Sequence, residues 1–156
     1  MEDPQASLSE PSFELTTPTI VVVIPAYNVS KHIEKVLGQI PGFVAHIVVV
    51  NDSSSDNTAE LVKNWKDLRV HLITHESNQG VGGATLSGYS AAIQLGATVI
   101  VKVDGDDQMD LAYLADLILP VIRRQADYSK GNRFMHPDEL RSMPWVRRLG
   151  NTAYPS

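Results

Sequence analysis

An α/β fold with a mostly parallel sheet flanked by helices is predicted by two features of this 156-residue sequence. First, β-branched runs alternate with segments of helical periodicity, a pattern that joins parallel strands through right-handed crossover helices. Second, a polar, glycine-rich or acidic segment follows each strand run. Because the carboxyl ends of parallel strands lie at one edge of the sheet, these segments should gather there, where open α/β sheets bind ligands.

The first strand and the first helix follow from an apolar run and a helical repeat. Residues 19–24 form a continuous β-branched run closed by Pro25, as expected for a strand buried on both faces. Ser30 is expected to cap a helix over residues 30–40. The apolar face of this helix should contain Ile33, Val36, Leu37 and Ile40.

The second strand and helix show the same succession. Residues 44–50 are the next apolar run and lead directly into the polar sequence NDSSSD. Asp56, at the end of that sequence, is expected to cap the second helix. The apolar residues of that helix are Leu61, Val62 and Trp65.

The third strand is predicted at residues 70–74, before a glycine-rich loop at residues 78–83. A helix of small residues follows and should end at Gly96. Gly88 and the Ala91-Ala92 pair of this helix are expected to allow close packing on the sheet.

The fourth strand, residues 98–103, ends in an acidic cluster. A further helix follows, and Pro120 inside it is expected to kink or shorten it. Residues 127–134 are the expected fifth strand. The helical repeat before that strand consists of Leu111, Leu114, Leu117, Ile118, Val121 and Ile122.

Composition and charge exclude several classes of function. The formal net charge of −5 argues against a general nucleic-acid-binding protein, which would carry a basic stripe. The absence of cysteine excludes disulfides, thiolate metal sites and a thiol nucleophile. No apolar run reaches the ~18 residues that span a bilayer, and the N-terminus lacks the apolar core of a signal peptide. These features predict a cytoplasmic protein.

The acidic cluster after the fourth strand is the strongest candidate site. Clustered carboxylates repel one another unless a cation or several donors lie between them. An Mg²⁺ or Mn²⁺ ion bound by one or two carboxylates, with water and diphosphate oxygens as further ligands, would suit this spacing. The alternative is a solvated acidic turn in which Asp110 caps the following helix. The cluster consists of Asp104, Gly105, Asp106, Asp107 and Gln108.

The other strand ends offer candidate ligand contacts, each with a structural alternative. The turn from Pro25 to Asn28 lacks the glycine fingerprint of a dinucleotide-binding turn. Tyr27 could stack on a base or cover the end of the sheet. Asp52 could accept hydrogen bonds from a nucleotide or form an Asx turn. The glycines at residues 78–83 could bring backbone amides close to a ligand or serve an ordinary turn.

Two groups of charged or titratable residues are less informative. Near the C-terminus, guanidinium groups that could bind phosphate could equally form a solvated face. This basic group consists of Lys130, Arg133, Arg141, Arg147 and Arg148. The histidines show no ligand-like spacing, and none receives a role. They are His32, His46, His71, His75 and His136.

Five ordered segments together resemble the glycosyltransferase family 2 proteins of the GT-A fold, and among them the polyprenyl- or dolichyl-phosphate mannosyl- and glucosyltransferases. The segments are VVVIPAYN, VVVNDSSSDNT, NQGVGGATLSGYSAAIQLGA, VIVKVDGDDQMD and KGNRF. They extend over residues 19–134, and the ordered set is far more specific than any one of its motifs. The resemblance implies a Rossmann-like GT-A domain with a DXD-type metal motif.

The resemblance also implies roles for individual residues. Mg²⁺ or Mn²⁺ would be held by Asp106 and Gln108. The residues assigned to catalysis are Asp104, Asp106 and Arg133, and Arg133, assisted by Arg147 or Arg148, would contact the acceptor phosphate. The nucleotide-sugar-binding residues would be Pro25, Tyr27, Asn28, Asp52, Gly80, Gly83, Asp104 and Gly105. The sequence departs from the family pattern at Asn51, at Ser53-Ser54 and at Asp107.

The activity implied is transfer of a hexose from a GDP- or UDP-sugar to a polyprenyl or dolichyl phosphate. A phosphate acceptor is already anionic at neutral pH, so the reaction needs no strong general base. One alternative is a non-catalytic nucleotide-sugar-binding fragment, and another is transfer to a sugar hydroxyl in polysaccharide or cell-wall synthesis. A sugar-phosphate nucleotidylyltransferase is disfavoured, because the first strand lacks a glycine-rich basic loop after it.

Three segments are expected along the chain. Residues 1–18 should form a mobile tail, rich in Ser, Pro, Glu and Thr. Residues 19–134 should form the nucleotide-sugar-binding domain, and residues 135–156 the start of an acceptor-side region that is cut short. A longer parent protein would then associate with the cytoplasmic face of a membrane through its missing C-terminal part. A homo-oligomer is compatible with this expectation.

Overall fold

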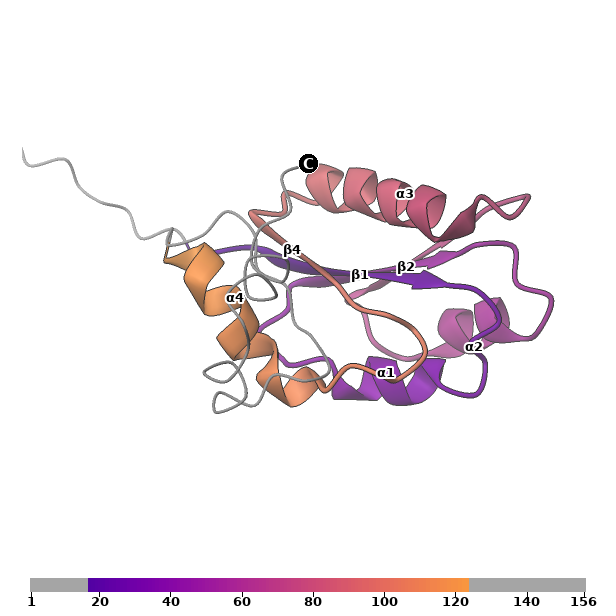
Figure 1. The fold of residues 1–156 in the computed structure, drawn as a ribbon, viewed down its shortest axis with the longest axis horizontal. Coiled ribbons are helices and arrows are strands. Elements are labelled where there is room, and N and C mark those ends of the chain that lie inside the picture. Colours follow the sequence, from indigo (N-terminus) through magenta and orange to yellow (C-terminus); the bar gives the residue numbers. More distant parts are fainter. Residues whose placement is uncertain (1–16, 124–156) are drawn as a thin grey trace, which may run out of the picture.

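A parallel sheet is the centre of the fold, in a computed structural model that describes residues 17–123 (Figure 1). Its strands are β1 (Ile20–Ala26), β2 (His46–Asn51), β3 (Val70–Thr74) and β4 (Val99–Lys102). The strand order is β3-β2-β1-β4, and every neighbouring pair is parallel. The predicted α/β class with a mostly parallel sheet is confirmed.

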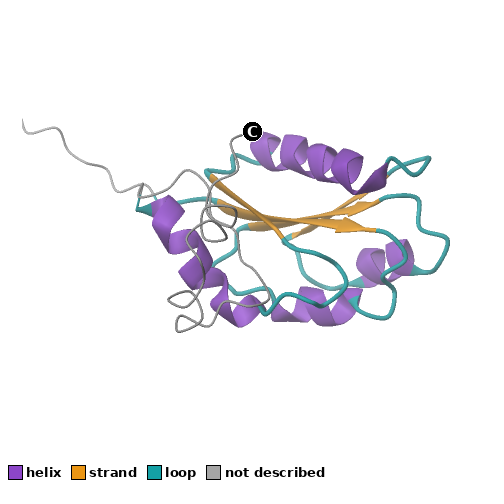
Figure 2. Cartoon of the chain, in the orientation of Figure 1, coloured by secondary structure: helices purple, strands orange, loops and turns teal. Residues whose placement is uncertain are grey.

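Helices cover both faces of this sheet. They are α1 (Ile33–Gln39), α2 (Thr58–Asn64), α3 (Gly80–Gln94), the 3-10 helix η1 (Leu111–Tyr113) and α4 (Leu114–Ile122). Helix α3 lies on one face, and α1, α2 and α4 lie on the other (Figures 1 and 2). Within residues 17–123, no helix is long and apolar enough to cross a membrane.

Both faces of the central strands are buried, as their continuous apolar runs predict. On one face, Val23 and Val50 belong to a cluster that includes Ala92 of α3. On the other face, Ile24 belongs to a larger cluster that includes Ile33 of α1. Because the strands are held from both sides, their carboxyl ends form a fixed edge from which the following loops extend.

Close packing of α3 on the sheet depends on Gly88. A Cβ atom at this position would lie 2.2 Å from Cγ1 of Val23 and 3.3 Å from Cγ2 of Val50. No side chain larger than hydrogen fits there unless the helix moves away from the sheet. The expectation that small residues of this helix allow close packing is confirmed.

The connections between strands change direction beside β1. The chain passes from β1 to β2 and β3 on one side, and then crosses back to place β4 on the other side of β1. Such a change leaves a crevice beyond the carboxyl ends of the two strands that flank it, which is where open α/β sheets bind ligands. In this protein, those strands are β1 and β4.

Pro25 lies inside β1, which extends two residues beyond the end expected at residue 24. Alternate residues of a strand direct their backbone groups to opposite neighbours. Val23 faces β4, since its carbonyl oxygen accepts a hydrogen bond from the amide of Val103. Pro25 therefore also faces β4. The next backbone hydrogen bond between β1 and β4 would need an N–H group at this position, which proline lacks. The ladder ends there, and the chain beyond Val103 leaves the sheet.

The expectation that Ser30 caps the first helix is wrong. Helix α1 begins at Ile33, and His32 at its N-cap makes no side-chain capping bond. The amide of Ser30 instead donates to the carboxylate of Asp56, at 3.1 Å. A residue from the loop after β2 thus fixes this turn, and the helix starts only after the turn is complete. The expected buried face of the helix is confirmed.

Two further helix boundaries differ from expectation. Helix α3 begins at Gly80, so Gly80 and Gly83 belong to its first turn and not to a free loop. Pro120, expected to kink or shorten its helix, lies inside α4, and α4 continues past it to Ile122, the last residue of the predicted repeat. Three expected features lie outside the described residues. They are the fifth strand at residues 127–134, most of the N-terminal tail and the basic group near the C-terminus.

Candidate functional site

Strained backbone conformations gather in the loops at the carboxyl edge of the sheet. Within residues 17–123, the non-glycine residues with positive φ are Asn28 (51°), Ser53 (60°) and Asp107 (60°). They follow β1, β2 and β4, respectively. Left-handed conformations are unfavourable for such residues and cluster at functional sites. The backbone therefore points to the edge that the sequence predicts as the site.

Asn28 joins the first two of these loops. Its Oδ1 accepts hydrogen bonds from the amide of Ser55, at 2.8 Å, and from the amide of Asp56, at 3.3 Å. Its own amide donates to the hydroxyl of Ser54, at 3.0 Å. The side-chain oxygen of Asn28 is thus used inside the protein, and its contact with a nucleotide sugar stays a prediction. Tyr27, just before it, is 52% exposed at the edge of the sheet.

Asp56 has a structural role, as expected. Its Oδ1 accepts a hydrogen bond from the amide of Thr58, the first residue of α2, at 3.0 Å. Burial works against the charged form of this carboxyl group, but hydrogen bonds from Thr58 and Ser30 outweigh it and lower the pKa of Asp56 to about 2. Asp56 therefore acts as a charged acceptor between two loops.

Asp52 is the buried carboxylate of the site, with a side chain only 3% exposed. Its Oδ1 accepts hydrogen bonds from Nδ1 of His75 and from the amide of Gln79, both at 2.8 Å. Burial opposes the charged form of Asp52. The hydrogen bonds from Gln79, His75 and Gly80 overcome this opposition and hold the pKa below its ordinary value. Asp52 is therefore a carboxylate that the protein keeps ionised in a nearly dry position.

His75 is a residue of this site that the sequence analysis left without a role. Its Nε2 lies 2.8 Å from the hydroxyl of Ser87 on α3, so one imidazole connects the strand edge to that helix. The sequence signal that could have found His75 is its position directly after β3, at the same edge of the sheet as Asp52. In the structure its amide donates to the carbonyl oxygen of Asn51, next to Asp52. The spacing between histidines could not reveal this role, because the partners of His75 are an aspartate and a serine.

Two of the three glycines expected to contact the nucleotide sugar, those in the first turn of α3, have structural reasons to be glycine. Gly80 has a φ of 78°, which L side chains rarely adopt. A Cβ atom on Gly83 would lie 2.7 Å from Cβ of Gln79. Both glycines therefore help to place the Gln79 amide against Asp52. Their contact with a ligand remains a prediction.

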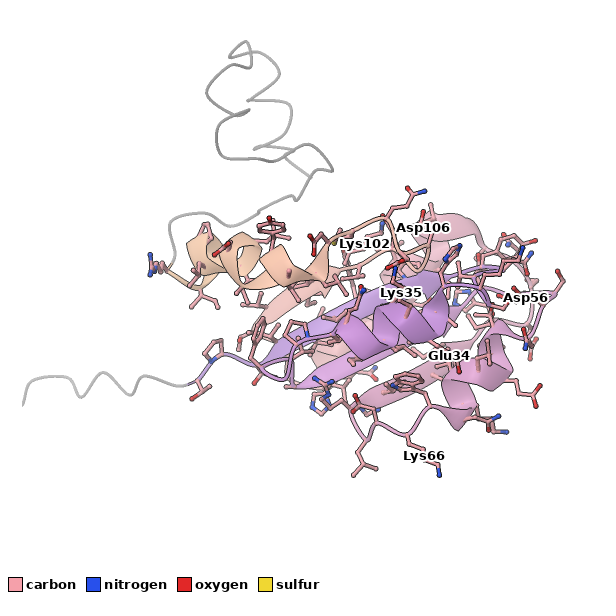
Figure 3. The ribbon with its side chains drawn as sticks, turned by 90° about the horizontal axis from the view of Figure 1, so that it is seen from below. Glu34, Lys35, Asp56, Lys66, Lys102 and Asp106 are labelled. Atoms are coloured by element: carbon pink, nitrogen blue, oxygen red, sulfur yellow. The ribbon has the colours of Figure 1, made fainter. Side chains whose placement is uncertain are left out.

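The acidic cluster leaves the sheet after β4, and two lysines balance part of its charge. Nζ of Lys102 donates to Asp104 at 2.7 Å, and Nζ of Lys35 on α1 donates to Asp107 at 2.5 Å. Figure 3 labels Lys35 and Lys102 together with Asp106. Asp107 is largely covered, whereas the Asp104 side chain is 53% exposed. Asp107 thus anchors the cluster to α1, and Asp104 remains open to a ligand.

Gly105 has a packing role within this cluster. It is buried, and a Cβ atom there would lie 3.2 Å from Cγ2 of Val29, in the loop after β1. Glycine therefore lets the acidic cluster pack against the loop that follows β1. Asp110 caps the next element, as expected, because its carboxylate accepts from the amide of Ala112 at 3.0 Å.

The acidic cluster has a donor set that suits Mg²⁺ or Mn²⁺. Among residues 17–123, no group of three or more His, Cys, Asp or Glu side chains converges on a metal position. These hard cations, however, are commonly held by one or two protein oxygens, with substrate phosphates and water as the other ligands. The oxygens of Asp106 and Gln108 fit this pattern, since Asp106 is half-buried and Gln108 exposed two residues further on.

The fold and the acidic edge define a glycosyltransferase domain of the GT-A type. Crystal structures of glucosyl-3-phosphoglycerate synthase from Mycobacterium tuberculosis share this fold. In complex with UDP, that enzyme has a TM-score of 0.55 and 19% identity, over 85% of this chain and 50% of its own. A second structure, in complex with Mn²⁺, UDP-glucose and phosphoglyceric acid, has a TM-score of 0.50 and 21% identity, over 67% and 39%.

The chain belongs to glycosyl transferase family 2, whose profile matches residues 21–155. The chain is 35% identical over 147 residues to UDP-N-acetylglucosamine--dolichyl-phosphate N-acetylglucosaminyltransferase of Methanococcus voltae, covering 85% of this chain and 59% of that protein. It is 29% identical over 151 residues to the polyprenol monophosphomannose synthase of Mycolicibacterium smegmatis, covering 94% and 57%. The chain therefore spans between half and three fifths of the length of these relatives. Membership of the family confirms the resemblance seen in the sequence.

Proposed function

We propose that this chain contains the donor-binding part of a metal-dependent glycosyltransferase that moves a hexose from a nucleotide diphosphate sugar to a polyprenyl or dolichyl phosphate. The observation that carries the proposal is the acidic cluster beyond the carboxyl ends of β1 and β4, at the same edge of the sheet as the exposed Tyr27 and the buried Asp52. An edge of this composition suits a nucleoside at one end and a diphosphate at the other. The first relative named above carries dolichyl-phosphate in its name and the second is a polyprenol monophosphomannose synthase, which supports the choice of a lipid-linked acceptor.

Each part of the edge has a task in this proposal. Tyr27 stacks on the base, and Asp52 accepts a hydrogen bond from it. Asp104, the most exposed of the charge-paired aspartates, lies beside the ribose and the diphosphate. Asp106 and Gln108 hold Mg²⁺ or Mn²⁺, which, when bound, neutralises negative charge on the diphosphate and so improves it as a leaving group. Arg133, outside the described residues, is assigned to the acceptor phosphate.

The proposed reaction does not require the protein to remove a proton from the acceptor. An oxygen of the acceptor phosphate attacks the anomeric carbon, and the bond from that carbon to the diphosphate oxygen breaks. The acceptor phosphate is already ionised, so no residue of the edge has to act as a strong base. This agrees with an edge in which Asp52 is held by hydrogen bonds and Asp107 by a lysine.

Asp106→Asn is the direct test of the metal assignment. We expect this substitution to weaken Mn²⁺-dependent binding of a nucleoside diphosphate at least about tenfold, because it removes a charged ligand. Binding is measured by calorimetry at several Mn²⁺ concentrations. Asp116→Asn is the matched control, since Asp116 is an exposed carboxylate in the first turn of α4 and lies away from the acidic cluster. Unchanged affinity and metal dependence in Asp106→Asn would contradict the assignment.

Transfer of labelled sugar to a polyprenyl phosphate tests the acceptor. We expect the protein to form a labelled lipid-linked product when the nucleotide sugar, Mn²⁺ and polyprenyl phosphate are all present. Nucleotide binding without any transfer would instead favour a non-catalytic nucleotide-sugar-binding fragment. Product formed only with a sugar hydroxyl acceptor would favour the polysaccharide type of reaction.

A further inference from the structure

His46 and His71 form a pair at the amino ends of two neighbouring strands. His46 is the first residue of β2, and His71 is the second residue of β3. Nδ1 of His46 lies 3.1 Å from Nε2 of His71, and the centroids of the two rings are 5.2 Å apart. The two histidines are 25 positions apart in the sequence, so the fold and not their spacing brings them together. The pair lies at the opposite end of the strands from the candidate donor site.

The register of the sheet explains this pairing. Val48 of β2 and His71 of β3 are partners in the register, so their side chains are on the same face of the sheet. His46 is two residues before Val48 and therefore shares that face. It is the face that α3 covers, since Val48 belongs to the cluster that includes Ala92 of α3. Backbone pairing alone thus places the two imidazoles side by side.

Each imidazole of the pair has a second nitrogen that is open to water. Among the described residues, Nε2 of His46 and Nδ1 of His71 make no hydrogen bond, yet no buried side-chain nitrogen lacks a partner. Both side chains are half-buried. The outer nitrogens can therefore carry the ring hydrogens, which leaves a lone pair on each of the two facing nitrogens. His75 differs, because Asp52 and Ser87 occupy both of its ring nitrogens.

The separation of the two facing nitrogens suits a divalent transition-metal ion. Zn²⁺ binds imidazole nitrogen at ~2.0–2.1 Å, so two such ligands are roughly 2.8–3.4 Å apart at bond angles of about 90–110°. The 3.1 Å between Nδ1 of His46 and Nε2 of His71 lies within this range. A hydrogen bond between the two rings has the same length. A small rotation of each ring would let an ion take the place of the shared hydrogen.

Arg69, the charged residue nearest to His71 along the chain, has its own partners. Its guanidinium group donates to the carboxylate of Asp67 and to the carbonyl oxygen of Pro41, each at 2.8 Å. The positive charge of Arg69 is therefore balanced within the protein, and it opposes a cation at the histidine pair only weakly.

We propose that His46 and His71 form a binding site for a divalent transition-metal ion of the Zn²⁺ type, with water as the remaining ligands. This site differs in chemistry from the acidic cluster, because imidazole suits Zn²⁺ whereas carboxylate and amide oxygens suit Mg²⁺ or Mn²⁺. A bound ion joins β3, an outer strand of the described sheet, to β2 through side chains. The proposal does not depend on the proposed function.

Calorimetric titration of the protein with Zn²⁺, without nucleotide and in excess Mg²⁺ to occupy the acidic cluster, tests this proposal. We expect His46→Gln and His71→Gln each to weaken Zn²⁺ binding at least about tenfold, because the site needs both imidazoles. His32→Gln is the matched control, since His32 is an exposed histidine at the N-cap of α1, and it should leave the affinity unchanged. Equal Zn²⁺ affinity in the parent and both pair variants would overturn the proposal, as would a loss confined to His32→Gln.

Nuclear magnetic resonance of the parent protein gives a second readout that needs no variant. Zn²⁺ should shift the imidazole signals of His46 and His71 together and leave those of His75 in place, because both nitrogens of that ring are already bonded. Zn²⁺ should also raise the melting temperature of the parent protein by an amount that grows with its concentration. Zn²⁺-induced shifts confined to other histidines would overturn the proposal.

Discussion

Ser53 shows at the scale of one residue how the site constrains the chain. It directly follows Asp52 and has a φ of 60°, a conformation that glycine adopts without strain. The sequence departs here from the family pattern, in which glycine is commoner. The strained serine keeps the loop on its path from the buried carboxylate to Ser54 and Ser55, which bond with Asn28.

Replacing Ser53 should therefore show a preference for glycine over alanine. The left-handed conformation costs an L residue about 1–2 kcal/mol, so Ser53→Gly should be more stable than Ser53→Ala by about 1 kcal/mol. Urea unfolding measures the difference. At Ser77, an exposed loop residue whose φ is not positive, the same pair of substitutions should not favour glycine. Equal stability of the two Ser53 variants would show that the loop is not strained.

Asp56, again a single residue, makes the free energy of unfolding depend on pH in the acid range. Its pKa in the folded protein is about 2, against an ordinary value of 3.8. The ionised group therefore stabilises the fold fully above about pH 5, and this contribution is lost as the pH falls from about 5 through about 2. Asp56→Asn removes it, so the gap in unfolding free energy between the parent and the variant should narrow over that range. A gap that is constant from pH 6 to pH 2.5 would contradict the assigned hydrogen bonds.

At the scale of single elements, the sequence predicted which strands and helices form better than where they end. The runs of Val and Ile in β1 and β2 identify strands buried on both faces, because few other structures bury every residue of such a run. The end of β1 was misplaced because Pro25 is compatible with the strand only where β4 stops pairing. Ser30 was misjudged because its partner Asp56 is 26 residues away.

Helix α3 shows how one element can determine the site. Gly88→Ala should destabilise the fold by about 1–3 kcal/mol although alanine favours helices, because its Cβ would clash with Val23. Gly82→Ala, in the same helix with no atom within 4 Å of a new Cβ, should not destabilise it. Thermal or urea unfolding compares the two. A Gly88→Ala protein as stable as Gly82→Ala would mean that α3 does not pack as described.

Position along the strands was enough to locate most of the candidate site. Asp52, Asp104 and Tyr27 each follow a strand, and parallel strands carry such residues to one edge. The network between Asp52, His75 and Ser87 could not be predicted, because it joins residues from two strand ends and the middle of a helix. Only the packing of α3 on the sheet brings Ser87 to the imidazole.

At the scale of the whole molecule, the described residues form one sheet whose switch point between β1 and β4 faces the acidic cluster. Family 2 membership and the GT-A fold agree with this arrangement. The proposed base-binding end, at Tyr27 and Asp52, and the acidic end, at Asp104 to Gln108, follow three different strands. A nucleotide diphosphate sugar is the ligand that would need both ends at once.

Thermal stabilisation by nucleotide diphosphate sugars, with and without Mn²⁺ or Mg²⁺, tests this central claim most directly. A ligand that binds only the folded protein raises its melting temperature, by an amount that grows with ligand concentration. We expect a UDP- or GDP-sugar with Mn²⁺ to raise the melting temperature well above the effect of either component alone, and Asp106→Asn to lose this synergy. No stabilisation by any UDP- or GDP-sugar in the presence of either metal would contradict the assignment of this edge as the donor site.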